Sequence, residues 1–451
     1  MLSVDWKVRA MKYEGCEDGY SSAGGVPALL DLVAGSSFYW GLTNCMPERK
    51  SNYSYKPIQF GLTLFAGFLK GYDCLDDLDQ LPFDAAIEEK LKEIPSSRAM
   101  GEFLRDFKRE QLSSFNHLLT DQSLEIREKL TKDEPLVIDI DSTSHVQRGK
   151  KMEGLAFNYK NEWCLDSLVA FDELGLCYAM ELRPGNTFSS VGAGEMIDQI
   201  FSRVKKSRRK NYFRGDSAFC NEDVMRACLL KDLIFTITAH GNTLWEEAVA
   251  LGKVTEWKPW KYTEEEIKAA EECKTTLPQV EVGFFYYTPE WADNLKFKII
   301  VKRTWVENLG QSKQPGWKYY GVLTNWDLYL DTPQMVMEFH QKRGNAENFI
   351  REGKYGYDLK HFPCKKMTAN HAYGLFALLV HNYIRTLAML DNPKNPHYAK
   401  KMRRKYVYIP CRVVHSSRYV TVKIPNSSKK EVDELKHAWA SRFGSALKKA
   451  A

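Results

Sequence analysis

The sequence lacks the features expected of a membrane or exported protein. No part of the 451 residues approaches the run of roughly 18 apolar residues that crosses a bilayer. The first residues, MLSVDWKVRAMKYEG, contain no apolar segment like that of a signal peptide. We therefore expect no membrane partner and a cytoplasmic location.

The sequence also lacks clustered cysteines, internal repeats and low-complexity segments. The ten cysteines include no CxxC pair, which argues against a zinc cluster and favours reduced core residues. We find no internal repeat, and proline and glycine are spread thinly, so linkers should be short. With 44% hydrophobic and 27% charged residues, the composition is that of a folded protein with about two to four domains.

The net charge of +6 is small, but the positive charge is concentrated. Residues 203–214, RVKKSRRKNYFR, hold seven basic residues and no acid. Residues 400–430 hold ten, again without an acid, and include Lys401, Arg403 and Arg404 together with three tyrosines. Basic runs with aromatic residues favour a polyanion such as DNA. A solvated basic surface explains the same charge pattern.

Residues 1–130 are predicted to form a helical N-terminal domain that binds DNA. Apolar spacing predicts a helix over 58–71. A second amphipathic run over 95–119 opens with serines suited to an N-cap and exposes a basic side that includes Arg98. This run fits a helix-turn-helix-like DNA contact, and it also fits a solvated basic face.

The pattern changes near residue 135, where strands and helices begin to alternate. This order predicts an α/β fold with a mixed sheet flanked by helices. The predicted strands are 135–143, 164–173, 175–185, 211–219 and 232–239, and the predicted helices are 193–206 and 221–231.

Three further regions complete the predicted domain organisation. Residues 131–240 form the first part of the predicted core. A β-rich insertion with many Trp and Tyr residues, 241–326, interrupts it. The core resumes over 327–390, with a long helix after Thr332 and a buried apolar helix over 368–390. Residues 391–451 form a basic C-terminal region.

Two aspartates are candidates for a functional site on the sheet. Asp141 follows an apolar strand and shares a strand face with Asp139. Because a carboxylate in mid-strand is costly to bury alone, it suggests a metal ligand, although capping of the next loop is an alternative. Asp216 ends a strand beside a glycine, where α/β sheets often display functional carboxylates and where an Asx turn is equally common.

A third candidate group lies on a predicted helix. His340, Arg343, Glu347 and Lys354 fall on one helical stripe, and polar groups at such spacing do not form a core face. The stripe is either an ion-pair ladder or a metal-binding carboxylate flanked by cations for phosphates. Nearby Gly344 and Gly353 weaken the helix and disfavour a purely structural ladder.

Three carboxylates suit phosphodiester cleavage. Two Mg²⁺ ions about 4 Å apart stabilise the attacking and leaving oxygens in this chemistry. Mg²⁺ prefers oxygen ligands and keeps several waters, so a few carboxylates suffice.

Taken together, the strings LVIDIDST, RGDSAF and HQKRGNAENFIREGK resemble the DDE transposases of bacterial insertion sequences. The similarity is greatest to the insertion-sequence 1380 group, allied to the group 4 family with its Y-x2-R-x3-E-x6-K signature. Arg343, Glu347 and Lys354 match that signature, whereas His340 replaces its tyrosine. The resemblance covers residues 135–390, with a weaker match at SSAGGVPALLDL.

The resemblance implies an RNase H-like core that nicks DNA at the element ends and transfers the freed 3′-OH into target DNA. It implies that Asp141, Asp216 and Glu347 bind Mg²⁺, with Mn²⁺ as a substitute. Asp141 rather than Asp139 is chosen because the family's first motif reads Asp-x-Thr. Arg343 and Lys354 would contact DNA phosphates, and we predict that His340 makes a DNA contact in place of the tyrosine. An exposed histidine without a role, or a core histidine whose ring nitrogens meet backbone carbonyls, is the alternative for His340.

The expected partners are the terminal inverted repeats and target DNA, bound by a homodimer on paired ends. The tryptophans of the insertion, Trp257, Trp260, Trp305 and Trp317, either stack on a flipped base or pack in the core. A nuclease or recombinase without strand transfer, and a DNA-binding protein that has lost catalysis, are the alternative functions. The presence of all three carboxylates argues against the last.

Overall fold

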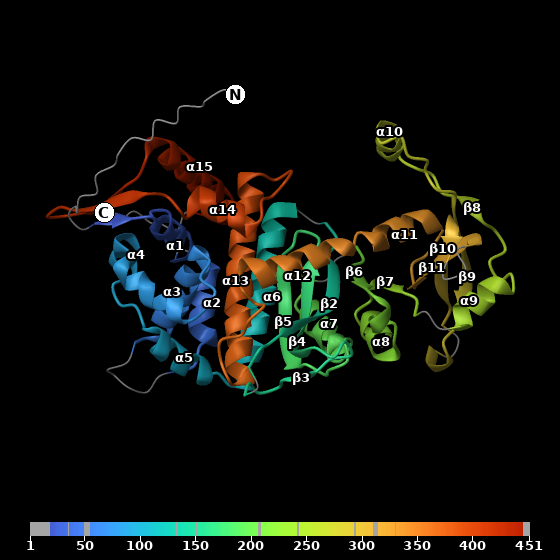
Figure 1. The fold of residues 1–451 in the computed structure, drawn as a ribbon, viewed down its shortest axis with the longest axis horizontal. Coiled ribbons are helices and arrows are strands. Elements are labelled where there is room, and N and C mark those ends of the chain that lie inside the picture. Colours follow the sequence, from blue (N-terminus) through green and yellow to red (C-terminus); the bar gives the residue numbers. More distant parts are fainter. Residues whose placement is uncertain are drawn as a thin grey trace, which may run out of the picture.

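The computed structural model describes residues 19–34, 36–48, 55–131, 134–149, 151–205, 209–240, 243–292, 295–309, 314–329 and 331–444. The long axis runs from a helical part, through a central sheet, to a second group of strands (Figure 1). No helix within these ranges is long and apolar enough to cross a membrane.

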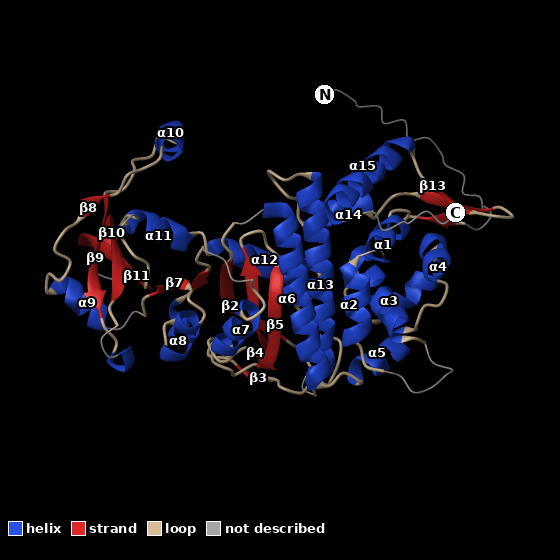
Figure 2. Cartoon of the chain, turned by 180° about the vertical axis from the view of Figure 1, so that it is seen from behind, coloured by secondary structure: helices blue, strands red, loops and turns tan. Residues whose placement is uncertain are grey.

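The helices that precede the sheet pack around the long helix α13 (Met367–Asp391), as Figure 2 shows. Aromatic side chains make this contact: the Phe115 and Phe376 rings meet edge to face with centroids 4.8 Å apart. The predicted helix over 58–71 is confirmed. The elements are α1 (Val26–Ala34), α2 (Ser37–Cys45), α3 (Pro57–Lys70), the 3-10 helix η1 (Asp76–Phe83), α4 (Ala85–Leu91), α5 (Ser97–Arg105) and α6 (Arg109–Thr131).

The predicted amphipathic run over 95–119 forms two helices, α5 and the first part of α6. The Ser96 hydroxyl caps α5 as expected, accepting a hydrogen bond from the Ala99 N–H. The chain then leaves the helix after Arg105, because Phe107 turns into the core. Its ring packs against Phe103 of α5 and Phe376 of α13.

Along the chain, the central sheet and its helices follow the predicted order: three strands, a helix, a strand, a helix and a strand. The strands lie in the spatial order β5–β4–β2–β6–β7. β2 pairs antiparallel with β4, and parallel with β6, so the predicted mixed sheet is confirmed. The elements are β2 (Val137–Val146), β3 (Ala156–Phe157), β4 (Trp163–Asp172), β5 (Cys177–Pro184), α7 (Ala193–Phe201), β6 (Tyr212–Gly215), η2 (Ser217–Phe219), α8 (Glu222–Leu230) and β7 (Ile234–Thr238).

The β-rich insertion extends the central sheet instead of forming a separate one. Its last strand pairs with β7 through Val322 opposite Thr238, so one sheet of ten strands runs through both parts. Figure 1 shows the inserted strands beyond β7. The elements are α9 (Thr243–Ala250), β8 (Lys258–Pro259), α10 (Glu264–Glu272), β9 (Val280–Tyr287), η3 (Glu290–Ala292), β10 (Phe297–Leu309) and β11 (Gln314–Thr324).

The prediction of one long helix after Thr332 is wrong. The structure has α11 (Pro333–Gln341) and α12 (Gly344–Gly356), separated at Lys342 and Arg343. Glycine has low helix propensity, and Gly344 lies at this break. The apolar helix predicted over 368–390 is α13, which is buried along most of its length.

The C-terminal region returns to the N-terminal helices. Strand β12 (Cys411–His415) pairs with β1 (Tyr20–Ser21) on one side and β13 (Val420–Lys423) on the other. Helices α14 (Ala399–Tyr406) and α15 (Asn426–Phe443) both contact α13. In α15, Trp439 is buried and its ring meets Tyr383 edge to face.

A buried ion pair joins the two central parallel strands. The Arg214 guanidinium donates to both oxygens of Asp139, at 2.6 Å and 2.7 Å. Its third nitrogen donates to the Phe339 carbonyl of α11 at 3.0 Å. Burial raises the pKa of Asp139 to about 6, and the hydrogen bonds from Arg214 oppose that rise. Arg214 thus ties β2, β6 and α11 together.

Replacing Asp139 with Asn should lower the free energy of unfolding by about 3–5 kcal/mol, because it leaves the buried Arg214 charge uncompensated. Denaturant unfolding at neutral pH measures this. As the control, Glu222→Gln breaks an exposed pair with Arg226 and should cost less than about 1 kcal/mol. Equal stability of Asp139→Asn and wild type would show that the pair does not hold the strands.

Candidate active site

Asp141 and Asp216 lie side by side because their strands run parallel in a defined register. Asp139 of β2 lies opposite Arg214 of β6. Each aspartate follows its own member of that pair by two residues. Neighbouring strands are about 4.8 Å apart, so the two carboxylates meet at one edge of the sheet. Asp216 also caps η2, with its carboxylate accepting from the Ala218 N–H at 2.8 Å.

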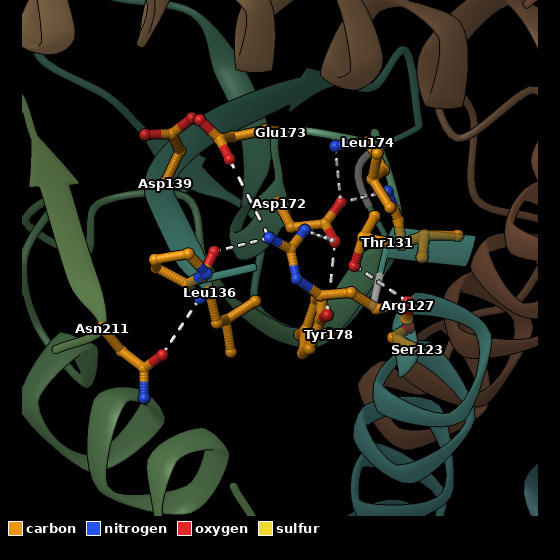
Figure 3. Close-up of polar contacts among 12 residues, drawn as sticks. Ser123, Arg127, Thr131, Leu136, Asp139, Asp172, Glu173, Leu174, Tyr178 and Asn211 are labelled. Carbon is orange, nitrogen blue, oxygen red and sulfur yellow. Dashed lines mark hydrogen bonds and ion pairs between the residues drawn. The ribbon is translucent and has the colours of Figure 1, made fainter. Parts of the chain in front are cut away.

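A second polar network fixes the starts of the same two strands (Figure 3). The Asn211 side chain accepts from the Leu136 N–H, and the Leu136 carbonyl accepts from Tyr212. From α6, the buried Arg127 guanidinium donates to Asp172 at the end of β4 and to the Pro135 carbonyl. The register that aligns the aspartates is therefore held at both ends.

Glu347 reaches the same edge from above the sheet. It lies in the first turn of α12, which packs over β2 and β4. Arg343, just before that helix, bridges the two elements. Its guanidinium lies 3.5 Å from Asp141 and 3.8 Å from Glu347. The structure thus brings together four of the residues that the sequence singled out.

The charges of the three carboxylates act on one another. Burial raises the pKa of Asp141 to about 6, and the neighbouring Asp216 charge raises it further. The Arg343 charge opposes this rise, while Glu347 adds to it. A site in which one carboxylate is influenced by two others favours a bound cation.

The residues present fit Mg²⁺ by their chemistry. All three candidate ligands are carboxylates, the oxygen donors that Mg²⁺ prefers. Their oxygens do not all lie within 4.8 Å of one another. Among described residues only Asp73, Cys74 and Asp77 meet that spacing, at the surface of a loop where acidic groups commonly stand without a metal.

Lys354 lies two turns beyond Glu347 on α12, over the same strand. Its ammonium donates to the Ser144 carbonyl of β2 at 2.7 Å. Burial lowers the pKa of Lys354, and the Asp166 charge counteracts this. The predicted DNA contact of Lys354 would require it to share this ammonium with a phosphate.

The structure places His340 in the interior, which corrects its predicted DNA contact. The side chain is 1% exposed. Its ring nitrogens meet the hydroxyls of Thr236 at 3.1 Å, Thr238 at 3.0 Å and Tyr320 at 3.1 Å. Burial lowers the pKa of His340 to about 3, and the Arg343 and Arg214 charges lower it further. A neutral, enclosed imidazole offers nothing to a phosphate near neutral pH.

Arg403 is likewise buried and is not available to DNA. It is 6% exposed and donates to the carbonyls of Phe68 and Leu69 at the end of α3. Cations at a helix C-terminus satisfy its free carbonyls, so this residue serves the fold. Lys401 and Arg404 on the same helix are exposed, as is Arg98 on α5, which pairs with Glu102.

The other basic run, 203–214, is partly paired within the protein. Arg203 forms a two-point contact with Asp121, and Lys205 pairs with Glu128. Residues 206–208 of this run lie outside the described residues.

The tryptophans of the insertion contact cations of the protein itself. The Arg303 guanidinium lies between the rings of Trp257 and Trp317, 4.1 Å and 4.4 Å from their centroids. The Lys302 ammonium lies 4.3 Å from the Trp260 ring. Trp305, which is 40% exposed, meets Trp317 edge to face.

Sequence reasoning missed the residues that support the site. Arg214 precedes Asp216 by two positions, so strand alternation should have placed it on the face of Asp139. The threonines around His340 gave no signal, because they lie about a hundred residues away in the chain.

Comparison with known proteins gives one match over almost the whole chain. The family described as "Transposase DDE domain group 1" matches residues 9–441. Among solved structures, a Mos1 transposase paired-end complex with left transposon end matches with 13% identity and a TM-score of 0.17. That match covers 50% of this chain and 74% of the other. No curated protein matches the chain.

The buried His340 should make the protein less stable in acid. Its pKa in the folded protein is below its value in the unfolded chain, so its contribution to stability is complete above about pH 6.5 and is lost as the pH falls toward 3. His340→Gln, whose amide can still meet the threonines, should reduce the loss of unfolding free energy between about pH 6.5 and 4.5 by about 2 kcal/mol.

Denaturant unfolding at a series of pH values measures this effect. His437→Gln, at an exposed position on α15, is the matched control and should follow the wild type. An unchanged pH dependence in His340→Gln would contradict a buried, neutral imidazole.

Proposed function

This chain belongs to the transposase DDE domain group 1 family, and from that premise we propose that it cuts DNA at the ends of a bacterial insertion sequence and joins the freed 3′-OH ends to target DNA. The observation that carries the proposal is the meeting of Asp141, Asp216 and Glu347 at one edge of the sheet. Two of these carboxylates come from adjacent parallel strands, and the third comes from the helix above them.

The strand order supports an RNase H-like core for this enzyme. Three antiparallel strands, β5, β4 and β2, are followed by the parallel strands β6 and β7. The His-x2-Arg-x3-Glu-x6-Lys string, matching the family signature at its last three positions, supports the insertion-sequence 1380 group. We propose the division into the N-terminal region 1–130, a core interrupted by 241–326 and a C-terminal region 391–451 on the same basis.

The three carboxylates would hold Mg²⁺, with Mn²⁺ as a substitute. When bound, a pair of such ions stabilises the attacking and leaving oxygens of the phosphodiester. Water attacks first, and the DNA 3′-OH attacks in strand transfer, so no side chain is needed as the nucleophile. Arg343 and Lys354, on either side of Glu347 along the chain, would neutralise phosphates near the cut.

Transposition of an element requires both of its ends in one complex. We therefore propose a homodimer on paired ends, acting on chromosomal DNA in the cytoplasm. A nuclease of the same fold would cut without joining. Incubating the protein with paired ends and a supercoiled target separates the two, because only a transposase yields joined products.

Asp141→Asn, Asp216→Asn and Glu347→Gln should each reduce cleavage about a thousandfold or more, since each removes a charged ligand from the transition state. The substitutions keep the size of each side chain, so binding of the ends should change little. Gel assays with DNA flanking the gene measure both quantities in the presence of Mg²⁺.

The exposed Asp223→Asn on α8, seven residues after Asp216, is the control and should cleave normally. A substituted carboxylate that leaves cleavage at the wild-type rate is not a ligand. Full cleavage in excess chelator would exclude the metal mechanism.

The exposed basic residues of α14 should contribute to DNA affinity through their charge. Changing Lys400, Lys401 and Arg404 to Gln should lower the slope of log K against log salt by about 0.9 for each phosphate that the helix no longer neutralises. Fluorescence anisotropy at several salt concentrations measures that slope.

Lys429 and Lys430 on α15 supply the comparison, since each already pairs with an acid one turn further on. Changing both to Gln should leave the slope near that of wild type. If the α14 variant also keeps the wild-type slope, this helix is a solvated face.

A further inference from the structure

We propose that Arg343 is a displaceable counter-ion: in the DNA-free protein it occupies the carboxylate site, and binding of DNA draws it to a phosphate and frees the site for divalent cations. This inference rests on the proposed function. It adds a coupling between DNA and the divalent cation, so that neither of these ligands binds well without the other.

The position of Arg343 supports this role. The guanidinium lies between Asp141 on the sheet and Glu347 on α12, within 4 Å of both. Its positive charge thus offsets part of the negative charge of Asp141 and Glu347. A divalent ion held by the same two side chains would be repelled by a guanidinium at this distance.

Arg343 is held loosely for a residue so enclosed. Its two ion-pair distances, 3.5 Å and 3.8 Å, exceed hydrogen-bond length. Its Nη1 is buried and donates to no acceptor within the protein. By contrast, the guanidinium of Arg214 makes two short bonds to Asp139 and a third to a carbonyl. A phosphate oxygen would give Arg343 the charge-assisted hydrogen bonds it lacks here.

The backbone around Arg343 gives it room to move. It lies at the junction of α11 and α12, and a side chain added at the following Gly344 would meet nothing within 4 Å. Glu347 is largely exposed at 66%, so the guanidinium has a path toward solvent along the first turn of α12.

Coupling between two ligands is reciprocal. If DNA removes the competing cation, then DNA raises affinity for the metal by the same factor that the metal raises affinity for DNA. Premature loading of the site is then disfavoured until an end is bound. Without Arg343 this dependence should disappear.

The test is Mn²⁺ binding to the full-length, DNA-free protein, measured by calorimetry and by electron paramagnetic resonance. Arg343→Gln should bind Mn²⁺ about tenfold more tightly than wild type. Arg343→Lys keeps the charge and should bind weakly, as wild type does. Arg351→Gln removes one positive charge from the same helix, where that side chain bonds to Asn348 instead of the carboxylates, and it should also match wild type.

A second arm adds a short duplex from the DNA flanking the gene. Mn²⁺ affinity should rise in the wild type but stay nearly constant in Arg343→Gln. Adding Asp141→Asn to Arg343→Gln should abolish the tight binding, which assigns the ion to this site.

The outcomes separate the two claims. Equal Mn²⁺ affinity in wild type and Arg343→Gln, with loss in Asp141→Asn, overturns the counter-ion role and leaves the proposed metal ligands intact. Tight binding that survives Asp141→Asn places the ion elsewhere and overturns the counter-ion role. No Mn²⁺ binding in Arg343→Gln overturns both the counter-ion role and the metal site.

Discussion

The parallel register of β2 and β6 is the constraint on which the candidate site depends. The buried ion pair between Asp139 of β2 and Arg214 of β6 fixes that register, because a shift of the strands would leave a buried charge without its partner. Because side chains alternate along a strand, a slip of one residue would turn Asp141 away from the edge. The register therefore fixes the relative positions of Asp141 and Asp216. Asp139, which has no part in the proposed catalytic site, thus positions Asp141 and Asp216, which do.

Arg214 also fixes the position of α11, the helix above the sheet. Its third nitrogen bonds to the Phe339 carbonyl, and its guanidinium lies over the Phe339 ring, 5.0 Å from the centroid. α11 is therefore attached to the sheet near its own C-terminal end. The break at Lys342 and Arg343 then sets the direction of α12, and so the position of Glu347. A continuous helix would carry His340 and Glu347 on one stripe, whereas the break buries the first and leaves the second exposed.

Much of this arrangement could be predicted from the sequence, because the signals were local. Apolar runs bounded by polar residues gave the strands, and the strand with Asp141 stood out by its buried charge. The single long helix predicted after Thr332 was wrong, although the low helix propensity of Gly344 was a local signal for the break between α11 and α12. His340 was predicted to contact DNA because it stands where the signature has a tyrosine, and Arg403 because it lies in a basic run. A basic or polar residue within a charged stretch looks exposed, and only the packing reveals that each is enclosed by partners from other elements.

The insertion also bears on the site, through His340. This ring joins three elements: Thr236 and Thr238 belong to β7, Tyr320 belongs to β11, and His340 itself belongs to α11. β7 is the last strand of the core, and β11 is the insertion strand that pairs with it. Since the ring is neutral and hydrogen-bonded on both nitrogens, it holds α11 against the junction of core and insertion without adding charge near the carboxylates. A displacement of the inserted strands would thus be passed to α11, and from there to Arg343 and Glu347 at its end. The insertion thus helps to hold α11 in place through His340, the residue that replaces the tyrosine of the signature that the sequence resembles.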